Sequence, residues 1–119
     1  MHLYVEQPMI EQIAPLARYL GARAVLWARG SGPLISFDEA LSGPWWRLQE
    51  HFKDRAPVPL ACASTTVELR SQTDVSDELA EQDAQAILNY LRERGVLAGP
   101  TPALPPALCE PTPLSATDD

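Results

Sequence analysis

The sequence predicts an α/β fold, a small layered domain with a short, mostly parallel sheet flanked by helices. Three observations predict it. The 119 residues are enough for one core but not for two. Apolar runs of strand length alternate with segments of helical spacing. The last 22 residues change to a proline-rich composition. We therefore expect one globular domain over residues 1–97 and a disordered tail over residues 98–119.

The first part of the chain predicts a strand, a helix and a second strand. A short strand is expected at His2–Val5, followed by a helix over about Pro8–Leu20 with one apolar side. Pro15 falls inside that helix, where an interior proline costs about 3 kcal/mol, so the helix is expected to be kinked or to begin late. The near-continuous apolar run "RAVLWARG" then reads as a buried strand.

A second helix is expected to begin at Pro44, with Ser42 or Gly43 as its cap, because proline is favoured at the first helical position. The run "VPLAC" that follows predicts another strand. Residues 66–70 can be read in two ways, and we slightly favour a helix. Their alternation of apolar and polar residues also fits a strand, which would make residues 57–71 a hairpin and the fold α+β.

The clearest element is a helix over about Asp77–Arg94, with apolar residues at three- and four-residue steps. Acidic residues occupy its early turns and arginines its last turn, as the helix dipole favours. Gly95 followed by Val96 predicts a Schellman stop.

The expected tail holds six of the twelve prolines, three acidic residues and no basic residue. Proline removes backbone donors and blocks helices, and the stretch has few large apolar groups, so it is predicted to be extended. The alternative is a proline-rich ligand for a partner's groove, from "PALPPAL".

Net charge, apolar run length and cysteine content limit the partners and the location that the sequence predicts. A net charge of −7 argues against nucleic acid as a partner, since that binding depends on clustered lysine and arginine. The apolar runs are shorter than the 18 or so residues needed to span a bilayer, so no membrane is expected. Two cysteines 47 residues apart fit a reducing, cytoplasmic location, and their spacing to the two histidines predicts neither a metal site nor a cofactor.

Cys62 is the candidate catalytic residue. If a helix follows it, Ser64 or Thr65 is the cap, and the thiol lies beside the positive end of that helix, which favours the reactive thiolate. The competing interpretation is that "LACA" is core, because free cysteine is often buried.

The stretches "LGARAVLWARGSGPL" and "WWRLQEHFKDRAPVPLACASTTVELR" resemble the DsrE family, including TusD-type subunits of sulfur-relay complexes, over about residues 2–71. The resemblance implies an α/β domain that forms oligomers and a persulfide carried on Cys62, with no metal or organic cofactor. This sequence departs from the family pattern at two places. The Arg-Gly that follows the cysteine segment in the family is Arg70-Ser71 here, and the helix at residues 77–94 and the proline-rich tail replace the family's last helix and strand. The function expected is a small cytoplasmic persulfide carrier.

The rival function is a non-enzymatic interaction module. Read as helix, hairpin, helix, hairpin and helix, the chain is similar in outline to roadblock-type adaptor domains. The adjacent Trp45 and Trp46 cannot both face one core from a helix, which favours a protein partner or a homo-oligomer. Whether the protein is an enzyme therefore stays open at this point.

Other patterns are interpreted as structural. "RGSGP" at residues 29–33 lacks a phosphate-binding motif and reads as a turn. Asp38 and Glu39 are interpreted as a helix-start pair rather than as an acid–base pair, and His51 as a surface or half-buried residue.

Overall fold

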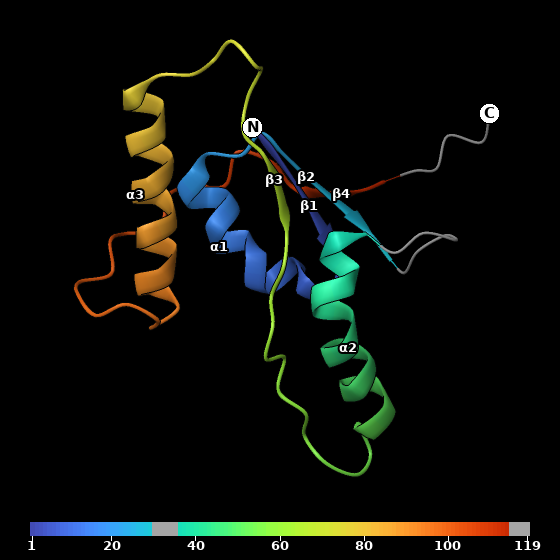
Figure 1. Ribbon diagram of the computed structural model, residues 1–119. Coiled ribbons are helices and arrows are strands. Elements are labelled where there is room, and N and C mark those ends of the chain that lie inside the picture. Colours follow the sequence, from blue (N-terminus) through green and yellow to red (C-terminus); the bar gives the residue numbers. More distant parts are fainter. Residues whose placement is uncertain (30–35, 115–119) are drawn as a thin grey trace, which may run out of the picture.

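Four strands form one open sheet in the order β3-β1-β2-β4 (Figure 1). The computed structural model describes residues 1–29 and 36–114. Strands β1 (His2–Glu6) and β2 (Ala24–Ala28) run parallel, as the crossover through a helix requires. Strand β4 (Pro111–Pro113) is parallel to β2, and β3 (Thr66–Glu68) is antiparallel to β1. The α/β class with a mostly parallel sheet is confirmed.

The core lies between one face of the sheet and helix α1 (Ile10–Leu20). Leu3, Val5 and Val25 point to that side and are buried together with the apolar face of the helix. Because side chains alternate along a strand, Tyr4 and Leu26 point to the other side, where they are only half-buried.

Helix α1 follows a short 3-10 turn, Gln7–Met9, and runs through Pro15 to a left-handed Gly21 with a φ of 65°. The helix therefore does not begin late enough to place Pro15 in its first turn, and Pro15 does not end it. Burial of Ile13 and Leu16 on either side of the proline compensates for its missing hydrogen bond.

Helix α2 (Phe37–Phe52) begins seven residues before Pro44, so the predicted start was wrong. Ser36 is the true cap, since its hydroxyl accepts a hydrogen bond from the Glu39 backbone N–H at 3.1 Å. Asp38 and Glu39 occupy the first turn, as predicted, where the helix dipole favours acidic residues.

Helix α3 (Asp77–Glu93) matches its prediction closely. The Ser76 hydroxyl caps it by accepting from the Leu79 N–H at 3.2 Å. It packs on α1, where Ala86 joins the core and the Tyr90 hydroxyl donates to the Gln12 carbonyl at 3.1 Å. Gly95 has a φ of 71°, and the Val96 N–H donates to the Leu91 carbonyl at 2.8 Å, which is the Schellman geometry.

Gly95→Ala is expected to destabilise the protein by about 1 kcal/mol. The cause is backbone strain alone, because a Cβ at Gly95 would meet no atom within 4 Å. Urea denaturation of the variant measures this cost. Equal or greater stability in the variant would contradict the left-handed conformation.

Residues 98–114 differ from the disordered tail that their composition predicted. They run along α1, where the Arg18 guanidinium donates to the Pro105 carbonyl and the Tyr19 hydroxyl donates to the Pro102 carbonyl at 2.9 Å. Strand β4 then completes the sheet. The missing N–H groups of its prolines are tolerated because β4 lies at the sheet edge.

In the part of the chain that the structure describes, every helix is too short or too polar to cross a membrane.

Candidate active site

A polar hollow lies at the end of the sheet where β1 begins and β3 ends. The antiparallel register places His2 directly opposite Glu68. The hollow, which we call the β1–β3 pocket, has a volume of about 370 Å³ and is lined by Met1, His2, Glu68, Leu69, Arg70, Ser71 and Asp74. It is the place where this fold brings a carboxylate, an imidazole and a guanidinium together.

Glu68 is the most available of these groups. It is exposed at the end of β3, and its carboxylate makes no hydrogen bond or ion pair with any described residue. Directly opposite residues of an antiparallel pair have Cβ atoms about 5 Å apart, so the carboxylate and the His2 ring face the same space. His2 itself is half-buried, and its ring packs nearly perpendicular to the Tyr4 ring, with the ring centroids 5.2 Å apart. A carboxylate and an imidazole are the side chains that most often act as general base or acid.

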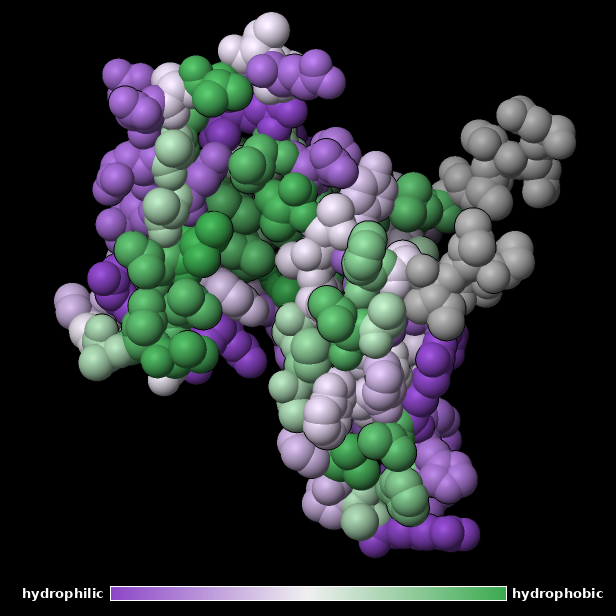
Figure 2. Space-filling view, viewed as in Figure 1, coloured by the Kyte–Doolittle hydropathy of each residue, from purple (hydrophilic) through white to green (hydrophobic). Residues whose placement is uncertain are grey.

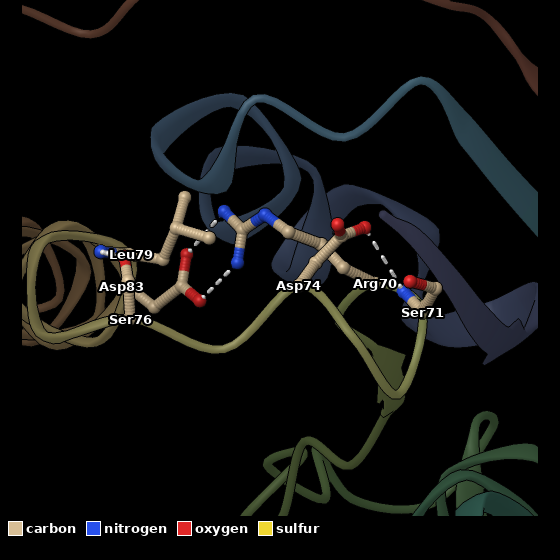
Figure 3. A network of polar contacts seen from close by, with 6 residues as sticks. All are labelled: Arg70, Ser71, Asp74, Ser76, Leu79 and Asp83. Atoms are coloured by element: carbon tan, nitrogen blue, oxygen red, sulfur yellow. Dashed lines mark hydrogen bonds and ion pairs between the residues drawn. The ribbon is translucent and has the colours of Figure 1, made fainter.

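Arg70 is fixed by Asp83 of α3, which accepts two parallel hydrogen bonds from the guanidinium, at 2.6 and 2.9 Å (Figure 3). This two-point contact sets the direction of the guanidinium as well as its position. The loop between β3 and α3 is also held at Ser71, whose N–H donates weakly to Asp74 at 3.4 Å. The pocket wall after Glu68 is therefore tied to a helix.

The ion pair changes the acidity of both partners. The hydrogen bond from Arg70 lowers the pKa of Asp83, against an opposing effect of burial, and the positive charge of Arg70 adds to the lowering. The same hydrogen bond raises the pKa of Arg70. At neutral pH both groups are thus charged.

Arg70→Gln should raise the pKa of Asp83 toward its ordinary value near 3.8. Because the native pKa is depressed, the pair stabilises the fold above the ordinary value and loses that contribution as the pH falls through the native one. NMR titration of the Asp83 carboxyl in both proteins measures the change, with Arg94→Gln as a control at the end of α3. An unchanged Asp83 titration in Arg70→Gln would show that the pair does not form in solution.

Cys62 does not occupy the position that the sequence predicted. It lies half-buried in the extended stretch before β3, and the next helix in the described part of the chain begins at Asp77. The hydroxyls of Ser64 and Thr65 donate to the carbonyls of Asp38 and Tyr4, both at 2.6 Å, instead of capping a helix. The argument for a thiolate at a helix end therefore fails, and the reactivity of Cys62 stays a prediction.

The reading of residues 66–70 as a helix was wrong, and "VPLAC" forms no strand in the structure. Val67 pairs with Leu3 and packs against the core, so the period-two pattern reflected a real strand. The hairpin alternative was wrong too, because β3 pairs with β1 rather than with the stretch before it.

Several of the remaining predicted positions make contacts within the fold. Asp38 accepts a hydrogen bond from the Thr66 hydroxyl at 2.8 Å, and Glu39 is buried in an ion pair with Arg47. His51 is exposed. Trp45 and Trp46 are both half-buried, and Trp46 packs against the core. The glycine-rich turn expected at residues 29–33 lies, after Arg29, outside the described residues.

Sequence reasoning did not single out Glu68, Arg70 or Asp83. The available signal was the alternation over residues 66–70, which places Glu68 on the face opposite to Val67. Within residues 1–29 and 36–114, no three histidine, cysteine or acidic side chains lie together where they could hold a metal ion.

The chain is similar in structure to two Shewanella proteins. One is a proposed succinylglutamate desuccinylase/aspartoacylase from Shewanella frigidimarina, with 31% identity and a TM-score of 0.72 over 95% of this chain. The other is a proposed protein of the same family from Shewanella amazonensis, with 30% identity and a TM-score of 0.74 over 95% of this chain. Comparison with models of protein families gave no match, and neither did comparison with curated proteins.

These similarities correct the expected function. Both neighbours are proposed desuccinylases or aspartoacylases, so the resemblance to the DsrE family was wrong, and so were the persulfide carrier and the adaptor inferred with it. That resemblance took Cys62 to end a strand, and the structure forms no strand there. The chain spans 29% and 30% of the two neighbours, and is thus similar to less than a third of each succinylglutamate desuccinylase/aspartoacylase.

Proposed function

We propose that this chain forms part of the active site of an amide hydrolase that removes an acyl group from glutamate or aspartate. The observation that carries the proposal is the similarity over 95% of the chain, at 30% and 31% identity, to two proteins named for those reactions. Because the chain matches less than a third of each neighbour, the proposal gives it one wall of the site rather than the whole enzyme.

The β1–β3 pocket supplies groups that suit this chemistry. Glu68 is placed to take a proton from a water molecule, whose oxygen then attacks the amide carbon. When the carbon–nitrogen bond breaks, the same proton passes to the departing nitrogen, which leaves as the free amine of the amino acid. Glu68 thus returns to the carboxylate with which it began.

Arg70 offers a positive charge in a chain whose net charge is −7. N-acylated glutamate and aspartate carry carboxylates, which a guanidinium recognises through directed hydrogen bonds. Asp83 occupies two of the N–H groups of Arg70 and leaves the others for a ligand.

A cytoplasmic location, expected from the two unpaired cysteines, belongs to the same proposal.

Two measurements test whether Glu68 and its pocket bind and hydrolyse N-acylated amino acids. When the rest of the enzyme is supplied together with this chain, release of free glutamate from N-succinylglutamate is expected to fall roughly 100-fold or more in Glu68→Gln. Glu78→Gln, which changes an exposed acid in the first turn of α3, is the matched control and should leave the rate unchanged.

NMR titration with N-succinylglutamate and N-acetylaspartate gives a second measurement that requires no turnover. Shifts are expected at Glu68, Arg70 and Ser71, and the neutral N-acetylalaninamide should cause none. Shifts confined to another surface, or hydrolysis at full rate in Glu68→Gln, would refute the proposed role of the pocket.

A further inference from the structure

The two edges of the sheet differ in what they can bind. Strand β4 forms one edge and carries Pro111 and Pro113, which have no N–H to offer a further strand. Strand β3 forms the other edge and contains no proline. Among the described strands β3 pairs only with β1, so its second side presents backbone donors and acceptors.

Apolar side chains are exposed beside the open edge. Leu69, directly after β3, is 48% exposed, and Val75 in the following loop is 83% exposed. Figure 2 shows apolar residues gathered on this face between α3 and the line of β3. An open edge with apolar neighbours is a surface that folded proteins usually pair or cover.

The comparisons indicate what covers it. Both Shewanella neighbours share this fold over 95% of the chain, yet the matched part is 29% and 30% of their length. Where their remaining polypeptide continues the shared sheet through hydrogen bonds, the prolines of β4 leave β3 as the edge for it among the described strands. A second copy of this chain fits poorly, because two chains of net charge −7 repel each other.

We propose that a strand of polypeptide equivalent to the part of the neighbours that this chain does not match adds to the open edge of β3. Backbone pairing would supply affinity, and Leu69 would anchor the contact. Since Glu68 belongs to β3 itself, the added strand would lie beside the β1–β3 pocket and could complete it.

The test uses the unmatched part of the Shewanella amazonensis protein as the probe, produced together with the full chain. We expect a one-to-one complex by light scattering after gel filtration. Hydrogen exchange of the amides of residues 66–69 should slow at least tenfold in the complex, while residues 111–114 should change less than twofold. No substrate is present, so the result is independent of the proposed hydrolysis.

Leu69→Asp and Leu114→Asp form a matched pair, because both leucines are 48% exposed and follow strands at opposite edges. Leu69→Asp should weaken the complex at least tenfold and Leu114→Asp less than twofold. The exchange measurement needs no variant, so misfolding of either variant leaves the test intact. Absence of a complex, protection at β4 or α2 instead of β3, or the same protection in the chain alone at high concentration would overturn the proposal.

Discussion

Removal of residues 98–119 is expected to lower the free energy of unfolding by roughly 4 kcal/mol, at about 1 kcal/mol for each intramolecular hydrogen bond lost. The bonds include those from Arg18 and Tyr19 to the carbonyls of Pro105 and Pro102. They also include the 2.8 Å bond from the Leu114 N–H to Trp27 and the weaker 3.6 Å contact of Cys109 with Ala22. Cys109 also packs against the core, so its removal exposes apolar surface.

Thermal and urea denaturation of the shortened chain measure this loss. Tyr19→Phe is the matched control, since it removes only the bond to Pro102 and should cost about 1 kcal/mol. A shortened chain as stable as the full one would mean that residues 98–114 do not hold their position against the body in solution.

Leu3→Ala should destabilise the protein by about 3 kcal/mol, within the range measured for buried leucines. Leu3 is fully buried and lies in the sheet between Val67 of β3 and Val25 of β2. The backbone on both sides is held by strand pairing, so the cavity left by the side chain cannot collapse easily.

Leu41→Ala is the comparison for that substitution, because Leu41 is 59% exposed on α2. Its replacement should lower the free energy of unfolding by less than about 0.5 kcal/mol. Urea denaturation of both variants gives the difference. Equal effects of the two substitutions would place the core elsewhere than between β1 and α1.

Local chemistry made some elements predictable from the sequence. Helix α3 carries its own signals, a serine cap, a helical apolar repeat and a glycine stop, and each acts within a few residues. Strands β1 and β2 are short apolar runs bounded by polar residues or a turn. The start of α2 was missed because Pro44 suggested a first turn, although Ser36 had the better capping geometry.

The strands β3 and β4 could not be predicted, because each forms only by pairing with residues far away in the sequence. Thr66–Glu68 become a strand because Leu3 and Tyr4 lie opposite them, and Pro111–Pro113 become one because β2 offers an edge. Neither partner is visible in the local pattern. The candidate site shares this origin, since His2 and Glu68 meet only through the strand register and Arg70 meets Asp83 only through the packing of α3.

The pairing of β2 with β4 joins positions that are far apart in the chain, with Val25 opposite Pro111. During synthesis from the N-terminus, β1, α1 and β2 can associate early, but the edge of β2 has to wait until residues 111–113 have left the ribosome. Pairing across such a loop is also slow, because chain entropy is lost before any contact is gained. The newly made chain therefore passes through an interval in which β2 is an unprotected sheet edge.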